Sequence, residues 1–360
     1  MKKILFMVPY PPGKAPSQRF RFEHFLKFME QNDSQCDFQP FVSVNDWDSL
    51  YSEMAKSSGF GILLSGFLTR IKGLFNLKMY DIIFIHRELT PIGPPIFEWI
   101  IAKILKKKII YDFDDAIWLP DQNKESTIWR WLKWRSKVTS ICKWSWKVSV
   151  GNEYLAEYAR RYNDEVIIMP TVVDTEIHKP LTPLHPPSMG DKVVIGWTGS
   201  HSTLQYLNKI LPALQQFEKS VDFEFRVIAN KDPQLTLKNY SFIKWNKESE
   251  IEDLNTFDIG VMPLPNDEWS KGKCGFKLIQ YLALEIPAVA SPVGVNKEII
   301  SHRKNGFLAN SHQEWMDGLT KLIQDKTMRK AFGKLGRNLI LRNYSAESQK
   351  GTFLSLFNDN

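Results

Sequence analysis

Short apolar runs alternate with longer amphipathic segments along this chain, which is the rhythm of βαβ units in a doubly wound parallel sheet. In the first half, the apolar runs predict strands at Ile4–Val8, Ile82–Ile85, Ile109–Asp112, Val148–Val150 and Val166–Met169. The rhythm restarts in the second half. There the pattern predicts strands at Val193–Thr198, Phe223–Ile228 and Ile259–Met262, and helices at Leu204–Phe217 and Glu250–Asn255. The fold class predicted is therefore α/β, with two Rossmann-like domains.

A proline-rich stretch separates the two series. Residues 176–192 carry Pro180, Pro183, Pro186 and Pro187, so they suit neither a helix nor a central strand. We interpret this stretch as a linker between a first domain at residues 1–175 and a second domain at residues 193–338. Open parallel sheets bind ligands beyond the carboxyl ends of their strands, so we expect the chemistry in a cleft between the domains.

The segment Lys271–Ile300 predicts a loop, a helix, a short buried strand and a second glycine turn. Gly272 and Gly275 allow the backbone to pass close to a ligand. Lys277 follows Phe276, where we expect the helix to begin and where unpaired N–H groups and the helix dipole favour an anion. The segment therefore predicts a diphosphate site, and with it a nucleotide-linked substrate.

The same segment resembles the donor-binding signature of retaining glycosyltransferases of the GT-B fold, family 4 type, also called group 1. Residues 282–291 resemble the family's glycine–proline strand, and Glu298 stands for the acid after the glycine turn. Further matches lie at Ile195–Ser200, Phe257–Leu264 and Gly306–Leu308. The resemblance implies two Rossmann-like domains facing each other across a cleft. It also implies a final helix, in residues 339–360, that crosses back to the first domain.

Three features of the second half depart from the family pattern. Gln280 stands where a glutamate usually holds the ribose, and Gly272 stands where the partner glutamate would be. Gln280 can still hydrogen-bond a hydroxyl, but without a charge. The turn Ser200–Thr203 lacks the arginine and lysine that many members place there, so we expect Lys271 or Lys273 to compensate.

A departing diphosphate carries negative charge, and stabilising that charge is usually the largest catalytic contribution. Lys277 is the first candidate for this role, and the backbone N–H groups of the turn at Gly199 are the second. The residues predicted to bind the donor are Gly199, Ser200, His201, Thr203, Gly275, Phe276, Lys277, Gln280, Val293, Gly294 and Glu298. The alternatives are a solvated helix lysine at Lys277 and simple helix capping by Ser200 and Thr203.

Carboxylates follow a predicted strand of the first domain, at Asp114 and Asp115. We expect them to orient an acceptor hydroxyl or to act as a base. A Mg²⁺ site, or a helix cap with an ion pair, is the alternative, although the resemblance implies that no metal is needed. Since Arg19 and Arg21 are two residues apart, they diverge on a helix, and one of them is expected to face the cleft. The predicted acceptor-side residues are Arg19, Arg21, His86, Glu88 and Asp112.

The chain has a net charge of +7 and a pI near 9.0, which favours an anionic partner. The segment Ile128–Lys147 interleaves tryptophans with lysines and arginines and contains no acidic residue. This chemistry fits an anionic membrane surface and also single-stranded nucleic acid. Because the family resemblance implies an acceptor that is commonly held in the membrane, we expect docking on an anionic membrane surface, and no nucleic acid, through Trp129, Trp131, Trp134, Lys133 and Arg135. Burial of some of these tryptophans in a core is the alternative.

The three cysteines match neither a disulfide framework nor a zinc site, so we expect a protein of the reducing cytoplasm. Together with the tryptophan-rich segment, this predicts a peripheral protein on the inner face of the cell membrane. The predicted activity is transfer of a sugar, with retention, from a UDP- or GDP-linked donor to a saccharide or lipid-linked acceptor, as in cell-surface polysaccharide synthesis. No cofactor and no protein nucleophile are expected. The alternatives are a nucleotide-sugar epimerase of the same fold and a non-catalytic membrane-associated scaffold. A dinucleotide oxidoreductase is disfavoured, because no Gly-x-Gly-x-x-Gly follows Ile4–Val8.

Overall fold

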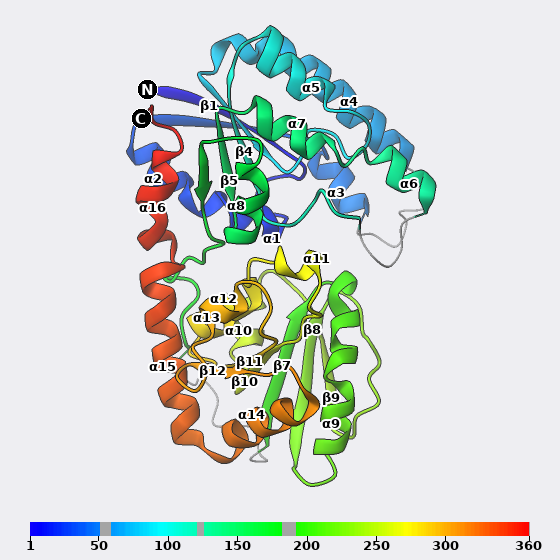
Figure 1. The fold of residues 1–360 in the computed structure, drawn as a ribbon, viewed down its shortest axis with the longest axis vertical. Coiled ribbons are helices and arrows are strands. Elements are labelled where there is room, and N and C mark those ends of the chain that lie inside the picture. The colour runs from blue at the N-terminus through cyan, green and yellow to red at the C-terminus, as the bar shows by residue number, and fades with distance from the viewer. Residues whose placement is uncertain (51–58, 121–125, 182–191, 360) are drawn as a thin grey trace. The chain divides into compact units, whose positions relative to one another are not determined.

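A computed structural model describes residues 1–50, 59–120, 126–181 and 192–359 (Figure 1). The chain forms two compact units. Unit 1 contains Met1–Thr171, Gly272–Cys274 and Gln349–Asn360, and unit 2 contains Val172–Lys271 and Gly275–Ser348. Each unit is a parallel sheet with helices packed on it, which confirms the predicted α/β class.

The sheet of unit 1 has six parallel strands in the order β2-β1-β3-β4-β5-β6. Its strands are β1 (Lys2–Val8), β2 (Ser34–Pro40), β3 (Ile82–His86), β4 (Lys108–Phe113), β5 (Lys147–Val150) and β6 (Val166–Ile168). Every residue of β3 is buried, as expected for a central parallel strand with helices on both faces. The sequence pattern missed β2, an edge strand whose residues are mostly half-buried and polar.

Helices, most of them short, pack on this sheet. They are α1 (Pro16–Arg19), η1 (Glu23–Phe25), α2 (Leu26–Gln31), α3 (Val44–Leu50), α4 (Gly59–Asn76), η3 (Leu77–Met79), α5 (Ile96–Trp99), η4 (Ile100–Ile104), α6 (Thr127–Leu132), α7 (Lys137–Trp144) and α8 (Glu153–Arg160). The last residues of the chain complete the core, since Phe353 stacks on Phe25 with ring centroids 4.3 Å apart. Lys147 anchors this tail through its ammonium group, which donates to the carbonyl oxygen of Asn358 at 2.7 Å.

The sheet of unit 2 also has six parallel strands, in the order β12-β11-β10-β7-β8-β9. Its strands are β7 (Val193–Gly199), β8 (Phe223–Ala229), β9 (Tyr240–Lys244), β10 (Ile259–Met262), β11 (Ala288–Ala290) and β12 (Gly306–Leu308). Its helices are η5 (His201–Lys209), α9 (Leu211–Phe217), α10 (Glu250–Leu254), α11 (Glu268–Lys271), α12 (Phe276–Ala283), α13 (Asn296–Ile299), α14 (His312–Gln324) and α15 (Lys326–Asn343). Trp197 and Trp315 are the largest side chains of its core.

Two predicted helices are interrupted. The segment Leu204–Phe217 forms the 3-10 helix η5 and then α9, with the break at Ile210 just before Pro212. The final helix predicted in residues 339–360 is α15 followed by α16 (Ala346–Ser355), with the break at Tyr344. From Gln349 onward the chain belongs to unit 1, so the segment does return to the first sheet. The predicted linker lies largely outside the described residues, at 182–191.

Candidate functional site

Candidate residues gather at the carboxyl-terminal edge of each sheet. In unit 1 the strand register places His86 beside Asp112, and Asp112 beside Ser149. In unit 2, β7 ends at Gly199, directly before the turn predicted to bind the donor. This edge is where open parallel sheets bind their ligands, so each unit is described from it.

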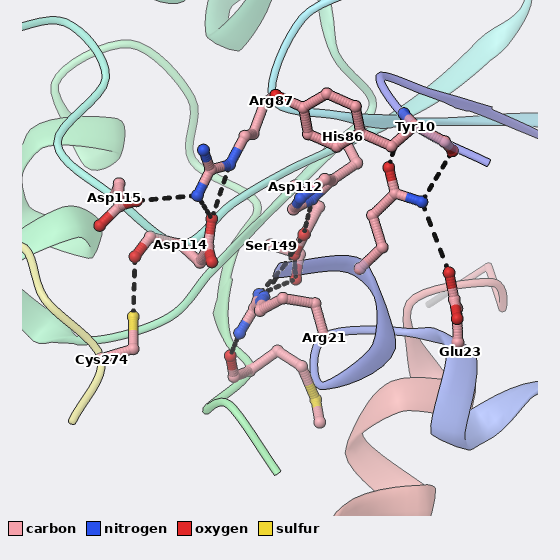
Figure 2. A network of polar contacts seen from close by, with 12 residues as sticks. Tyr10, Arg21, Glu23, His86, Arg87, Asp112, Asp114, Asp115, Ser149 and Cys274 are labelled. Atoms are coloured by element: carbon pink, nitrogen blue, oxygen red, sulfur yellow. Dashed lines mark hydrogen bonds and ion pairs between the residues drawn. The ribbon is translucent and has the colours of Figure 1, made fainter. Parts of the chain in front are cut away.

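A buried network in unit 1 is centred on Asp112, which is 2% exposed (Figure 2). The Asp112 carboxylate accepts hydrogen bonds from the Ser149 hydroxyl at 2.7 Å and from the Arg21 guanidinium. Its second oxygen lies 2.8 Å from Nδ1 of His86. Arg21 also donates to the carbonyl oxygen of Met169. The structure thus brings together three of the predicted acceptor-side residues and engages the Asp112 carboxylate with protein donors.

This environment keeps Asp112 ionised. Burial alone would raise the pKa of Asp112, but the charges and hydrogen bonds of Arg21 and His86 outweigh it and hold the pKa below its usual range. A buried ion pair of this kind is costly to break, because the remaining partner would stay buried and uncompensated. His86 keeps a second ring nitrogen, Nε2, that is buried and has no hydrogen-bond partner among the described residues.

A second cluster links Asp114 and Asp115 to two cations. Arg87 donates to Asp114 at 2.8 and 3.0 Å and to Asp115 at 2.8 Å. Lys273 donates to the other oxygen of Asp115 at 2.8 Å. Burial would raise the pKa of Asp115, yet Lys273 and Arg87 together lower it. Both carboxylates predicted to act on the acceptor are therefore matched by positive charges within unit 1.

Arg87 reaches these carboxylates from an unusual backbone conformation. Its φ of 61° lies in the left-handed region, which costs about 1–2 kcal/mol for a residue other than glycine. Its amide donates to the carbonyl oxygen of Asp112 at 2.7 Å, and this bond stabilises the conformation. The strained turn directs the guanidinium toward Asp114 and Asp115, as Figure 2 shows.

The loop Gly272–Cys274 belongs to unit 1, although the residues on both sides belong to unit 2. The side-chain amide of Asn152 donates to the carbonyl oxygens of Gly272 at 3.1 Å and Lys273 at 3.2 Å. The Cys274 thiol donates to the carbonyl oxygen of Asp114 at 3.0 Å. Burial raises the pKa of this thiol, and the nearby Asp114 carboxylate adds to the effect, so the thiol remains protonated.

These contacts revise the expected role of the loop lysines. Lys273 pairs with Asp115, and Lys271 pairs with Glu268 at 2.5 Å, so each lysine already contacts a carboxylate of its own unit. Gly272 also contacts a residue of unit 1, because its carbonyl oxygen accepts a hydrogen bond from Asn152. The expectation that Lys271 or Lys273 replaces the missing cations of the donor turn receives no support from these positions.

The other predicted acceptor-side residues lie apart from the Asp112 network. Glu88 forms an ion pair with Lys137 at 2.7 Å. Arg19 lies at the end of α1 with its guanidinium 4.8 Å from the ring centroid of Phe20. The prediction that Arg19 and Arg21 diverge is consistent with these contacts, because Arg21 alone enters the network.

In unit 2, the candidate phosphate-binding residues converge from two distant segments. The Lys277 ammonium lies 5.3 Å above the ring centroid of Trp197, a buried residue of β7. The Trp197 ring in turn lies against Gly199, where an added Cβ would come within 2.5 Å of it. Lys277 is half-buried on the first turn of α12. A cation, a helix start and the turn after β7 therefore meet at one place.

The turn after β7 is organised by its own hydrogen bonds. The His201 amide donates to the side-chain oxygen of Asn230 at 2.7 Å. The Thr203 hydroxyl and amide both donate to the carbonyl oxygen of Ser200 at 3.0 Å. The Ser200 side chain makes no capping bond, although its residue is the N-cap of η5. Simple capping by the Ser200 side chain is therefore wrong, and Asn230 is an additional residue of this turn.

Two of the predicted donor-site glycines are required by the backbone conformation and its packing. Gly275 has φ of 69°, and a Cβ there would lie 2.3 Å from Cδ1 of Ile299. Gly294 has φ of 53°, and a Cβ there would lie 2.8 Å from the carbonyl oxygen of Lys271. Both positions need left-handed backbone and close packing, which only glycine supplies readily.

Gln280 is buried and points toward an acid from another helix. Its amide donates to the Glu250 carboxylate at 3.3 Å, and the Trp245 indole donates to the same oxygen at 3.2 Å. Glu250 is itself buried at the start of α10, while Trp245 follows the end of β9. A carboxylate thus lies beside Gln280, the position at which the family pattern expects a glutamate.

The remaining predicted donor residues differ in exposure. Val293 is buried and follows β11, whereas Phe276 is half-buried on the first turn of α12. Glu298 is exposed on α13. Ser200 and His201, in the turn after β7, are exposed as well.

Sequence reasoning missed Arg87, Ser149 and Glu250. Arg87 lies between two residues that the sequence did single out, so its position in the same strand-end tripeptide was the available signal. Ser149 is found through strand register, and Glu250 through the packing of α10 against α12, neither of which a single sequence displays. Within the described ranges, no group of three or more His, Cys, Asp or Glu side chains is arranged to hold a metal ion.

Comparison with known proteins places these observations in context. Residues 192–325 match the family described as Glycosyl transferases group 1. A search of curated protein sequences found no match. Among solved structures, the chain is similar to HepE from Anabaena in complex with UDP and glucose, with a TM-score of 0.73, 13% identity and 99% of each chain covered. It is also similar to sucrose-phosphate synthase from Thermosynechococcus elongatus, with a TM-score of 0.70, 12% identity and coverage of 99% and 98%.

A glycosyltransferase from Rickettsia africae is similar too, with a TM-score of 0.70, 14% identity and coverage of 100% and 99%. At these identities, structural likeness establishes the fold. The matched proteins have the two-sheet architecture that the sequence motifs implied, and it extends over nearly the full length of the chain described here.

Proposed function

Residues 192–325 form a Glycosyl transferases group 1 domain in a chain with the GT-B fold, and from this premise we propose that the chain transfers a sugar from a nucleotide-sugar to a hydroxyl acceptor. One observation carries the proposal: Lys277, the start of α12 and the turn after β7 meet at the Trp197 ring. In this proposal the Lys277 ammonium stabilises the diphosphate as it departs. Because Lys277 is half-buried, its attraction to an anion is stronger than that of a lysine in bulk water.

We propose that Glu250 supplies the acid that the family pattern places at position 280. Its carboxylate receives hydrogen bonds from Gln280 and Trp245, which orient it at the carboxyl-terminal edge of the sheet. A carboxylate can accept from both hydroxyls of a ribose, whereas an amide offers one acceptor oxygen. The pair Glu250–Gln280 thereby restores an anionic acceptor without a glutamate on α12.

The donor in this proposal is a UDP- or GDP-sugar. The structurally similar HepE was solved with UDP and glucose, which supports a nucleoside diphosphate as part of the donor. The acceptor is a saccharide or a lipid-linked saccharide that contacts the unit 1 edge near His86 and Asp115. Transfer proceeds with retention, and neither unit is assigned a protein nucleophile. Cell-surface polysaccharide synthesis is the process that such an acceptor suits.

Titration calorimetry with a panel of UDP-, GDP- and ADP-sugars tests the donor assignment. We expect one nucleotide to bind and Lys277→Ala to lower turnover about 10²–10³-fold with an unchanged melting temperature. Lys297→Ala, which removes an exposed lysine from α13, is the matched control and should keep full turnover. If no nucleotide-sugar of the panel binds and Lys277→Ala leaves turnover unchanged, the proposed glycosyltransferase activity is excluded. Sugar conversion without any acceptor would instead identify an epimerase.

We also propose that the chain is a cytoplasmic protein, peripheral on the inner face of the cell membrane. Trp129, Trp131 and Trp134 are exposed on and after α6, with Arg130 and Lys133 among them. Tryptophan and cationic side chains suit the interface of an anionic bilayer. Arg135 contributes less directly, because its guanidinium donates to the carbonyl oxygen of Ile117 at 3.1 Å. Vesicle sedimentation should weaken when the three tryptophans become serine, and unchanged sedimentation would remove α6 from the interface.

A further inference from the structure

The longest helix of unit 1 exposes an apolar stripe along its whole length. Phe60, Leu64, Leu68, Ile71 and Phe75 on α4 are all exposed, with Phe60 at 81% and Phe75 at 80%. Their spacing of three and four residues places them within one side of an α-helix. A soluble protein seldom exposes a continuous row of large apolar side chains without using it.

The opposite side of α4 is fixed to the body of unit 1. Ile62, Gly66, Arg70 and Gly73 form its buried side. A Cβ at Gly66 would come within 2.4 Å of the Phe41 ring, so the helix backbone lies directly on its neighbours. The buried Arg70 guanidinium donates to the carbonyl oxygens of Val8 and Leu89 at 2.8 and 2.9 Å, respectively. The stripe is therefore held outward by contacts on the other side.

These contacts distinguish lying on a bilayer from crossing it. Gly59–Met79 is the one helical segment, among those the structure describes, that is long and apolar enough to cross a membrane by length and composition. Crossing would require Arg70 to leave its carbonyl partners and would place it in hydrocarbon, at a cost of several kcal/mol. Lying in the interface requires neither, because the exposed side alone would enter the lipid.

Charge identifies the lipid that suits this stripe. Within Gly59–Met79 there is no aspartate or glutamate, and Lys72 and Lys78 are exposed. The α6 segment Ser126–Arg135, in the same unit, also lacks acidic residues and exposes Trp131 at 70%. Two separate elements thus combine exposed aromatic side chains with positive charge alone, which favours an anionic surface over a neutral one.

We propose that the outer side of α4 inserts into the headgroup–acyl boundary of an anionic phospholipid bilayer, with the helix axis parallel to the membrane plane. This inference rests on the membrane association proposed above and extends it to a surface that the sequence pattern did not reveal. The α4 stripe supplies apolar insertion, while Lys72 and Lys78 contact lipid phosphates. An acceptor embedded in the membrane would then be presented to unit 1 without leaving the lipid.

Flotation of the full chain with vesicles tests this surface. The probes are vesicles of phosphatidylcholine alone and vesicles of phosphatidylcholine mixed with phosphatidylglycerol, which carry a negative surface potential. We expect Leu64→Ser/Leu68→Ser/Phe75→Ser to raise the lipid concentration for half-maximal binding at least about tenfold. Lys72→Gln/Lys78→Gln should weaken binding to the anionic vesicles and leave the neutral ones unaffected.

A matched control replaces exposed apolar residues of unit 2. Ile177→Ser/Leu335→Ser/Leu341→Ser removes a similar number of exposed apolar side chains from unit 2 and should bind vesicles like the native chain. Equal flotation of the native chain and the α4 variant would overturn the proposal. So would a native dimer in sedimentation velocity that becomes monomeric in the α4 variant while vesicle binding is retained, because the stripe would then be an interface between copies. Donor binding by calorimetry should be unchanged in every variant, which separates failure here from failure of the proposed enzyme.

Discussion

The charged side chains at the carboxyl-terminal edges of the two sheets have different kinds of partner. At the unit 1 edge, each carboxylate is matched by cations from the same unit: Asp112 by Arg21, and Asp115 by Arg87 and Lys273. At the unit 2 edge, the Lys277 ammonium lies over the Trp197 ring, and the Glu250 carboxylate receives hydrogen bonds from neutral donors. Both sheets are parallel and six-stranded, yet the carboxylates at the unit 1 edge form ion pairs, whereas the Glu250 carboxylate at the unit 2 edge accepts from an amide and an indole.

This difference teaches that clustered charges and functional charges need not coincide. The dense acidic segment Asp112–Asp115 drew attention in the sequence, but its carboxylates stabilise the edge of unit 1 through ion pairs. In the function proposed above, the charges of unit 2 contact the diphosphate and the ribose of the donor. We therefore expect mutations at the unit 1 edge to change stability first, and mutations at the unit 2 edge to change donor binding first.

The largest effect is expected for Asp112→Asn. The substitution leaves the buried Arg21 guanidinium without its charged partner, so the free energy of unfolding should fall by about 3–5 kcal/mol. Urea denaturation followed by circular dichroism measures the change. Asp359→Asn, which breaks the exposed pair with Lys108, is the control and should leave the free energy of unfolding almost unchanged. A similarly small loss for Asp112→Asn would contradict the contrast between the edges.

Acid should destabilise unit 1 through the same carboxylates. The pKa values of Asp112 and Asp115 are lowered in the folded chain, so the unfolded chain binds protons more readily there. Their stabilisation is present above the ordinary aspartate pKa of about 3.9 and is lost as the pH falls below it. We expect the melting temperature to drop steeply below about pH 4, and the drop to be shallower in Asp112→Asn. Parallel acid limbs for the two proteins would show that Asp112 is not responsible.

The smallest effect is expected at the unit 2 edge, for Glu250→Gln. Glutamine keeps an acceptor for Trp245 and Gln280 but removes the charge, so donor affinity should fall about tenfold with little change in stability. Calorimetric titration with the donor measures the affinity. Glu252→Gln, an exposed residue of the same helix, should bind the donor normally. If Glu250→Gln binds the donor tenfold more weakly at unchanged stability, and Glu252→Gln does not, the assignment of Glu250 to the donor site is strengthened. Equal donor affinities in the two variants would remove Glu250 from the site.

The fold was predictable where strands are buried on both sides, and less so elsewhere. The run Ile82–Ile85 needs no partner information, because a fully buried strand is apolar at every position. The edge strands β2 and β9 are half-buried and mix polar with apolar residues, so their pattern resembles that of a loop. The break before Pro212 had a visible signal, whereas the break at Tyr344 depends on packing that one sequence does not show.

The site was predictable in its segments and not in its pairings. The glycine-rich loop and the turn after β7 were identified from residue types, and the structure brings Lys277 and Gly199 to one aromatic ring. Which cation pairs with Asp115 depends on a loop from a distant part of the sequence, so local pattern could not assign Lys273 to it. The α4 stripe was missed for a related reason. The sequence of an apolar helix has the same pattern whether its second side faces a core or solvent.

The end of α16 and the residues just after it have a consequence for synthesis on the ribosome. Phe353 and Phe357 complete an aromatic core with Phe25 and Phe84 from the opposite end of the chain. Translation delivers the N-terminal strands first, but their hydrophobic interior stays open until these two rings emerge. Unit 1, although begun first, is therefore expected to finish folding only after unit 2 has been made, which reverses the usual N-to-C order of domain completion.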